Sequence, residues 1–237
     1  MNRTALKIVY EDDRMIAVDK PAGTLVVPGR GEAAGKPLAA QLQARWNRKA
    51  YVVHRLDRET SGVVVFAKDA EAHKLLCGQF EARTVGKRYL AVVHGALEVP
   101  GSVDKPLRRF GSGRIGIDPR GKNAVTRYRP LRVHDGATLI HVFPETGRQH
   151  QIRVHLFSIG HPVVGDPLYH KGPPDGAPRL LLHAERLKLL SPDGEPLTLK
   201  SDPSEDFTAA FEAVKKARAS APSPGARRRR GSGPIPG

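Results

Sequence analysis

Apolar residues occur along the chain in short runs that Gly, Pro and Asp interrupt. Seven runs have the length of a strand and are rich in β-branched and other apolar residues, which predicts β-strands. These runs are residues 7–10, 15–19, 52–54, 62–67, 89–94, 124–131 and 138–143. Together with the helical segments between them, they predict a compact folded region over residues 1–214.

Four other segments space their apolar residues three or four apart, which is the period of one helix face. They are residues 37–46, 69–83, 146–159 and 204–218. Asp69 is a capping residue type at the start of the second segment, and Thr146 can cap the third. Gly160 follows the third segment, where a helix end is expected. We therefore expect four helices.

The predicted strands outnumber the helices and do not alternate with them regularly. This order favours an α+β fold with a largely antiparallel mixed sheet, flanked by helices and loops, over a doubly wound parallel one. The length of 237 residues suits one main domain with a substantial core. We therefore expect a single domain over residues 1–214.

The remaining residues, 215–237, differ in composition. This stretch, "KKARASAPSPGARRRRGSGPIPG", carries seven positive charges and no acid. It has too few apolar residues to bury a core, which predicts a disordered basic tail. Two alternatives stay open for it: nonspecific affinity for RNA through counterion release, or a solvated terminus without a role.

The net charge of +15 and the isoelectric point near 10.3 make polyanions the expected partners, nucleic acid ahead of acidic membranes. Aromatic residues make up 5% of the chain, which argues against a sheet that stacks many single-stranded bases. Cys77 is the only cysteine, so an internal disulfide and a Cys-rich zinc site are excluded. The first residues include acids, and no apolar run reaches the ~18 residues of a membrane span. We therefore expect a cytoplasmic protein without a membrane partner.

Two apparent motifs lack the context that they need. The "GSGRIG" stretch, residues 111–116, matches G-x-G-x-x-G, but no helix is expected after it, so it predicts a basic hairpin or loop that contacts phosphate. His150 and His155 are five residues apart, which places them on different sides of a helix, and no carboxylate ligand accompanies them. We expect no metal site.

The stretch "HRLDRETSG", residues 54–62, lies between two predicted strands and places Asp57 between Arg55 and Arg58. Flanking cations favour the ionised form of a carboxylate. An ionised carboxylate suits a nucleophile or a charge-stabilising anion better than a general acid. A surface loop with a salt bridge is the alternative interpretation of the same residues.

Three segments together resemble the RluA-type family of pseudouridine synthases: "HRLDRETSG" (54–62), "GKRYLAVVHG" (86–95) and "TGRQHQIRVHLFSIGHPVVGDPLY" (146–169). The opening "IVYEDDRMIAVDKPAGTLVVPG" and the closing "PRLLLHAERLKLLSPDGEPLTL" are also similar to that family. The likeness spans roughly residues 6–205. It implies a pseudouridine-synthase-like catalytic domain that isomerises uridines in structured RNA, without a cofactor.

The resemblance also implies roles for individual residues. Asp57 matches the family's catalytic aspartate, and Arg153 in "QIRVH" matches the basic residue that pairs with it. Tyr89 in "KRYLAV" matches the active-site tyrosine, a floor for the base and a proton acceptor. Arg55 matches the arginine that takes the space of the flipped-out base. These residue types suit the chemistry, because the base must leave its stack, a planar guanidinium fills the gap well, and a tyrosine offers a flat wall with a polar tip.

The resemblance leaves several questions open. Members of the family often carry an N-terminal RNA-binding module of the S4 type, but here the match begins almost at once. Substrate choice then rests on the loops and basic surface of the catalytic domain, which favours a stem-loop of tRNA or ribosomal RNA recognised by shape. We also expect a monomer. Three routes stay open for the aspartate: attack on the anomeric carbon, assistance of an elimination to a glycal, or addition to carbon 6 of uracil. Because the resemblance pairs Asp57 with Arg153, we expect Arg58 to be dispensable.

Two rival functions remain. One is a noncatalytic RNA-binding protein on the same fold. The other is a hydrolase of glycosidic bonds, which needs a second acid near Asp57, and only Glu59 is close in sequence.

Overall fold

The structure is a computed structural model of the chain, and it describes residues 6–29, 35–134, 136–170 and 177–219. The helices are α1 (Leu38–Trp46), α2 (Ala70–Glu81), α3 (Gln151–Ser158) and α4 (Glu205–Ala219). The first six strands are β1 (Lys7–Glu11), β2 (Met15–Lys20), β3 (Tyr51–Val52), β4 (Ser61–Ala67), β5 (Gly86–His94) and β6 (Gly101–Asp104). The others are β7 (Leu107–Arg109), β8 (Ile115–Ile117), β9 (Val125–His134), β10 (Ala137–Pro144), β11 (Leu182–Leu190) and β12 (Pro196–Lys200).

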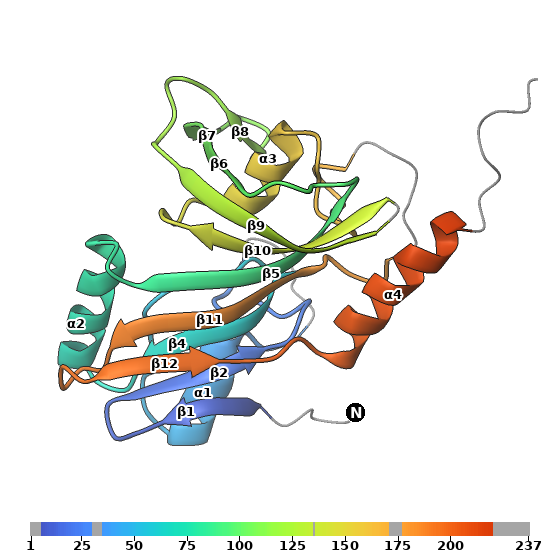
Figure 1. The fold of residues 1–237 in the computed structure, drawn as a ribbon. Helices are drawn as coiled ribbons and strands as arrows, with labels where there is room; N and C mark the ends of the chain where they lie inside the picture. The colour runs from blue at the N-terminus through green and yellow to red at the C-terminus, as the bar shows by residue number, and fades with distance from the viewer. Residues whose placement is uncertain (1–5, 30–34, 135, 171–176, 220–237) are drawn as a thin grey trace, which may run out of the picture.

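Ten of these strands form one sheet in the order β1-β2-β4-β11-β5-β10-β9-β6, with β12 added to β11 and β3 to β4 (Figure 1). Neighbouring strands are antiparallel except β4 and β11, which are parallel and pair through only two residue pairs. The prediction of an α+β fold with a largely antiparallel mixed sheet is confirmed. Helix α2 packs where β4 and β11 separate, against apolar side chains of both.

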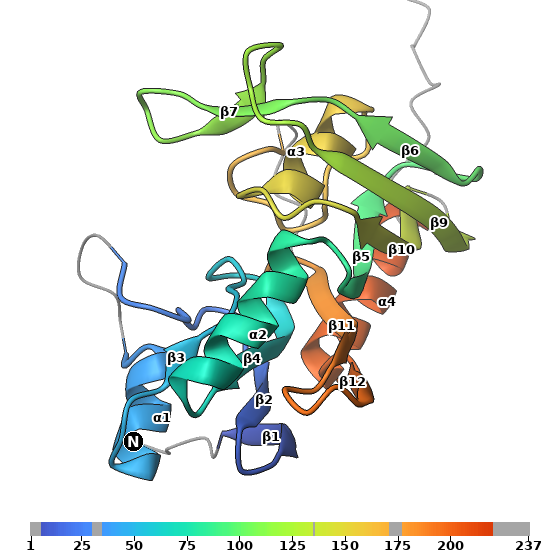
Figure 2. The same ribbon diagram turned by 90° about the vertical axis from the view of Figure 1, so that its left-hand side faces the viewer.

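The two faces of the sheet carry different helices. On β5, Ala91 and Val93 pack with α3, whereas the alternate residue Val92 packs with Phe207 and Phe211 of α4. Helix α1 packs on the same face as α3, because Tyr89 of β5 contacts both of their core clusters. We call the face with α1 and α3 the front face and the face with α4 the back face. In Figure 2, α1 and α3 lie to one side of β5 and β11 and α4 to the other.

All seven predicted strands are present within a few residues, but five strands were not predicted. The short β6 carries little pattern, and β11 and β12 lie in the leucine-rich closing segment, which does not distinguish strand from helix. The "GSGRIG" stretch supplies the turn and second strand of the β7–β8 hairpin. Gly113 in that turn has φ +81, and no helix follows, so the expectation of a hairpin is confirmed.

The predicted start of the third helix is wrong. Helix α3 begins at Gln151, and Thr146 does not cap it: the Thr146 hydroxyl donates to Oε1 of Gln151 at 2.7 Å and accepts from the Val125 N–H. The residue before the helix, His150, has a left-handed φ of 53°. Gly160 follows the helix with φ +83 as expected.

The predicted basic tail begins inside a helix. Helix α4 continues to Ala219, so its backbone includes the first five residues of the segment 215–237. Residues 220–237, with Arg227 to Arg230, lie outside the described residues.

Candidate active site

The loop between β3 and β4 carries Asp57 on the front face. Leu56 is buried in the core beneath α1, and the Thr60 N–H donates to the Asp57 carbonyl. The loop ends at Gly62, whose φ is +113. A Cβ at this position would lie 2.3 Å from the Ala184 carbonyl oxygen, so only glycine lets β4 start so close to β11.

Lys20, at the end of β2, holds the same loop in place through hydrogen bonds. Its fully buried ammonium group donates to the carbonyl oxygens of Pro21, Thr24 and Arg58 at 2.7 to 3.0 Å. Burial lowers the pKa of Lys20 to about 7, against the raising effect of Glu59 and Asp57. The three hydrogen bonds connect the "DKPAG" turn to the residue after Asp57.

Ser61 and His183 form a buried pair beside the loop. The Ser61 hydroxyl and Nδ1 of His183 are 2.9 Å apart, and Nε2 of His183 donates to the Ser201 carbonyl. Because Nε2 holds the proton, Nδ1 accepts from Ser61, whose oxygen then accepts from Arg179. This serine is fully hydrogen-bonded and buried, so the pair holds the loop and is not a nucleophile with its base.

The structure brings Asp57 and Arg153 together although 96 positions separate them. Nη1 of Arg153 lies 3.6 Å from Oδ2 of Asp57, and Nε2 of His150 lies 3.9 Å from the same oxygen. Arg153 is only 4% exposed, so it is no surface charge of α3. This buried guanidinium is thus the cation beside the Asp57 carboxylate.

A second carboxylate orients Arg153. Asp166 accepts from Nε and Nη2 of Arg153 at 2.7 and 2.8 Å, in a bidentate pair. Burial raises the pKa of Asp166, but Arg153 and the N–H groups of Leu168 and Tyr169 outweigh burial and hold that pKa below its usual range. Arg153 thus has one anchored partner and one, Asp57, that faces a cavity.

Tyr169 completes this arrangement. Its hydroxyl shares a 2.8 Å hydrogen bond with Nδ1 of His150, and the guanidinium of Arg153 lies 5.1 Å from its ring centroid. Asp166, Tyr169 and His150 all fall within the motif "TGRQHQIRVHLFSIGHPVVGDPLY", but the sequence analysis gave none of them a role at the site. Their burial and partners depend on tertiary packing, and the motif itself was the only signal in the sequence.

Tyr89 forms part of the wall of a cavity of about 110 Å³ that Asp57, Lys87 and Arg153 also line. A neighbouring cavity of about 380 Å³ shares Asp57 and Arg153 and extends towards residues 25–29. Burial, and then the charge of Asp57, raise the pKa of Tyr89 well above its usual range. The phenol is therefore neutral in the free site, where its O–H can donate a hydrogen bond but is not a base.

The two arginines that flank Asp57 in sequence point elsewhere. Nε of Arg58 donates to the Gly23 carbonyl at 3.1 Å and lies 3.5 Å from Glu59. Arg55 is exposed, lines both cavities, and makes no hydrogen bond or ion pair with any residue that the structure describes. Neither arginine makes an ion pair with Asp57 in the part of the chain that the structure describes; Arg153 and His150 are the groups beside that carboxylate.

His155 does not join His150 in a metal site. Its two ring nitrogens contact the Thr126 hydroxyl and the Lys105 carbonyl, each at 2.9 Å. Among the described residues, no three His, Cys, Asp or Glu side chains are placed to hold a metal ion. In the same part of the chain, no helix combines the length and the apolar character needed to cross a bilayer.

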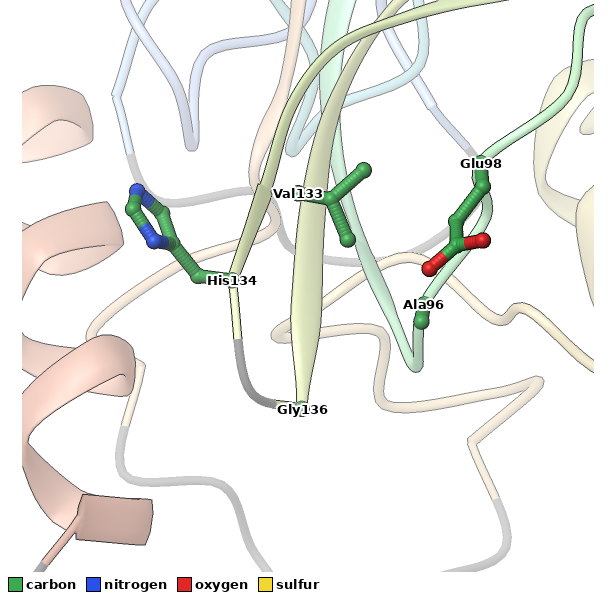
Figure 3. A pocket seen from close by; sticks show the side chains of 5 residues that line it. All are labelled: Ala96, Glu98, Val133, His134 and Gly136. Atoms are coloured by element: carbon green, nitrogen blue, oxygen red, sulfur yellow. The ribbon is translucent and has the colours of Figure 1, made fainter.

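A third cavity lies at the turn between β9 and β10 and shares no residue with the cavities at Asp57 (Figure 3). Its lining residues are Ala96, Glu98, Val133, His134 and Gly136. In Figure 3 the ring of His134 turns to the side opposite Glu98. The two polar side chains therefore do not converge on a ligand, and the candidate site is the one at Asp57.

The fold and this site define an RNA-modifying class of protein. The family model described as RNA pseudouridylate synthase matches residues 14–158. Two solved human structures have the same fold. RNA pseudouridylate synthase domain containing 1 matches with a TM-score of 0.75 and 26% identity, and the match covers 94% of this chain and 100% of that one. RNA pseudouridylate synthase domain containing 4 matches with a TM-score of 0.71 and 26% identity, and the match covers 88% of this chain and 92% of that one. The chain belongs to the RNA pseudouridylate synthase family.

Curated relatives are more similar in sequence. The chain is 44% identical over 225 residues to ribosomal large subunit pseudouridine synthase D of Nitrosomonas europaea, and the match covers 89% of this chain and 65% of the relative. It is 40% identical over 231 residues to the protein of that name in Xanthomonas campestris, with 89% and 70% covered. The chain thus spans about two thirds of the length of these relatives.

Proposed function

We propose that the protein is an isomerase that converts uridine in RNA to pseudouridine, with Asp57 as its catalytic carboxylate. One observation carries the proposal: the Asp57 carboxylate lies 3.6 Å from the buried guanidinium of Arg153 and faces the cavity that Tyr89 lines. Family membership supports the reaction class, and this geometry supports the choice of residues. We further propose that the enzyme needs no cofactor, that it is a monomer and that it acts in the cytoplasm.

The reaction breaks the bond between N1 of uracil and the anomeric carbon and forms a bond from that carbon to C5. C5 then loses its proton and N1 gains one, so the product is an isomer of the substrate. Arg153, held by Asp166, orients Asp57 towards the flipped nucleotide. The exposed guanidinium of Arg55 fills the space that the base leaves in the RNA stem. The three routes for Asp57, through the anomeric carbon, a glycal or C6 of uracil, all fit this arrangement.

Tyr89 serves first as a wall that retains the detached base. Its raised pKa opposes a role as proton acceptor, and burial is the larger cause of that shift. The smaller cause, the negative charge of Asp57, disappears while Asp57 is bonded to the nucleotide. Tyr89 is therefore a better acceptor for the C5 proton after Asp57 has reacted than before.

Ribosomal RNA is the proposed substrate. The relatives are named ribosomal large subunit pseudouridine synthases, which favours large-subunit ribosomal RNA over tRNA, the other class that the sequence left open. A hydrolase with two carboxylates has less support. Glu59 lies beside Arg58, and Asp166 is fully engaged by Arg153, so neither is free to act as a second acid at Asp57.

The test uses large-subunit ribosomal RNA and tRNA, each tritiated at C5 of uracil and prepared without pseudouridine. The wild type should release tritium from the ribosomal RNA, and Asp57→Ala should release at least 10³-fold less while it binds the RNA and unfolds at the same temperature. No release by the wild type from either RNA contradicts the isomerase. Equal release by Asp57→Ala contradicts the assignment of the carboxylate and favours another residue on the same fold.

A further inference from the structure

We propose that the back face of the sheet is a second RNA-binding surface, which contacts phosphates of an RNA segment other than the one that holds the target uridine. This proposal rests on the proposed function only in taking RNA as the partner. The surface consists of five basic side chains, which we call the back-face patch: Arg88, Arg129, Arg186, Lys188 and Lys200. They come from four strands, β5, β9, β11 and β12.

Strand register brings these residues to one face. Arg129 pairs with His141, and His141 pairs with Leu90, which lies two residues from Arg88 on the same side of β5. Arg88 in turn pairs with Arg186, and Arg186 with Lys200. Leu90 packs against the core beneath α4, so the whole series belongs to the back face. Since strands lie about 4.8 Å apart, the patch is a band of cations across the sheet.

Three members of the patch have unneutralised charges. Arg129 and Lys188 are exposed and Arg186 is half-buried, and none of them makes an ion pair with another described residue. The one ion-pair partner of Lys200 among the described residues is Asp202, whose side chain is 75% exposed, and such exposed pairs contribute little. Cations without acidic partners on an open surface attract polyanions and release counterions on binding.

The centre of the patch is rigid. Glu185 is 9% exposed and accepts from Nε and Nη2 of Arg88 at 2.6 and 2.8 Å. Nε2 of His141 lies 3.4 Å from Glu185, and Nδ1 of His141 is buried without a hydrogen-bond partner among the described residues. Glu185 neutralises Arg88 and fixes it, while Arg129 and Arg186 remain on either side to meet phosphates. A ligand in the centre would also offer Nδ1 of His141 a partner.

The patch and the active site face opposite directions. Arg88 and Tyr89 are consecutive residues of β5, so their side chains project from opposite faces of the sheet. Helix α4 covers the end of the back face near Val92 and Leu181, away from the patch. An RNA helix that presents its uridine to Asp57 on the front cannot also lie on the patch. The partner is therefore a second segment of a large folded RNA, which suits ribosomal RNA better than a short stem-loop.

The test compares two charge-reversed variants with equal changes in net charge. Arg129→Glu with Arg186→Glu alters the patch; Arg48→Glu with Lys74→Glu alters two exposed cations that neither belong to the patch nor line the cavities at Asp57. Equilibrium binding to protein-free large-subunit ribosomal RNA is measured at several salt concentrations. The single-turnover rate of tritium release is measured on the shortest fragment of that RNA that the wild type modifies.

We expect the patch variant to bind the large RNA at least tenfold more weakly than the control variant. The slope of log K against log salt concentration should be smaller by about 1.4 to 1.8, which corresponds to two lost phosphate contacts. Its rate on the short fragment should stay within twofold of the wild type. Equal binding of the two variants to the large RNA overturns the proposal, and so does an equal loss on both RNAs. Arg129→Gln with Arg186→Gln replaces the patch variant if charge reversal lowers the unfolding temperature.

The binding measurement separates this proposal from the proposed function. If the wild type releases no tritium from any RNA but binding still depends on the patch, the isomerase assignment fails and the back-face surface stands. If tritium release is normal and RNA binding does not depend on the patch, the isomerase assignment stands and the back-face surface fails.

Discussion

At the scale of single residues, Arg153 lies between two carboxylates with different surroundings. The side chain of Asp166 is fully buried and receives two N–H groups of the backbone, whereas the side chain of Asp57 is 27% exposed at a cavity. The buried carboxylate therefore anchors the guanidinium, and the exposed one is the carboxylate that we propose reacts. This division of roles makes Asp166 a positioning residue.

Asp166→Asn should lower kcat more than it raises KM. The amide keeps the shape of the side chain but removes the charge that aligns Arg153, so we expect a loss in kcat of about 10- to 100-fold. Steady-state tritium release gives both constants. If KM rises and kcat is unchanged, Asp166 acts on RNA binding and not on the geometry of Arg153.

His54 predicts a pH dependence of stability. Its Nε2 accepts from the Val65 N–H at 3.0 Å, and burial, followed by the charge of Lys87, lowers the pKa of His54 to about 3. The folded pKa is below the unfolded value near 6.5, so the stabilisation is complete above pH 6.5 and is lost as the pH falls towards 3. The free energy of unfolding should drop by up to about 1.4 kcal/mol per pH unit below 6.5.

Urea denaturation between pH 7.5 and 4.5 checks this prediction, with His54→Phe as the control. The variant should be less stable at pH 7.5, because the Val65 N–H loses its acceptor, but its stability should vary less with pH. Equal slopes for the two proteins rule out His54 as the source of the pH dependence.

At the scale of elements, α4 is connected to the catalytic loop through one side chain. Arg179 contacts Asp206 at the start of α4 at 3.2 Å, lies 5.7 Å from the ring of Phe207, and donates to Ser61 at the end of the loop. The position of α4 therefore bears on Ser61, four residues after Asp57. We therefore propose Arg179 as a second positioning residue, which acts on the loop through Ser61.

Arg179→Gln should lower kcat by about five- to fiftyfold and leave the affinity for RNA unchanged, because the loop loses a restraint and no RNA contact is removed. Ser61→Ala should produce a similar loss, and the double variant should lose no more than the larger single loss, since both changes remove one interaction. Additive losses would show that Arg179 acts by a route other than Ser61.

The sequence predicted some helices and strands better than others. Strands such as β2 and β4 are apolar and β-branched, and their local pattern is enough to predict them. The stretch "LHAERLKLL" consists mainly of helix-forming residues, and it is the strand β11 because β4, β5 and β12 pair with it. The start of α3 was missed because Thr146 bonds the side chain of Gln151, a choice that depends on the neighbouring β9.

The sequence predicted the site residues that lie in recognisable motifs. It did not predict the residues whose roles depend on burial and on distant partners. Asp57, Tyr89 and Arg153 came from three separate motifs, and the structure places them around one cavity. The roles of Asp166, Lys20 and Arg179 depend on partners that lie far away in sequence. Arg58 is the converse case: its closeness to Asp57 in sequence suggested a contact, but the side chain turns to Gly23.

At the scale of the whole molecule, the sheet separates two surfaces with different chemistry. The front face holds an anion, Asp57, within a cavity, and the back face holds a band of cations. In our proposal the net charge of +15 attracts RNA to both faces, and Asp57 on the front face is the group that reacts. Catalysis should therefore depend on very few of the 39 lysines and arginines, and Arg153 is foremost among them.

The most direct test of this account is the single-turnover rate of tritium release from saturating large-subunit ribosomal RNA, measured side by side for Arg58→Ala and Arg153→Met, with unfolding temperatures recorded for both. We expect Arg58→Ala to stay within threefold of the wild type and Arg153→Met to lose about 10²-fold or more, because Arg153, unlike Arg58, lies beside the Asp57 carboxylate. A folded Arg153→Met that reacts as fast as Arg58→Ala would contradict this account.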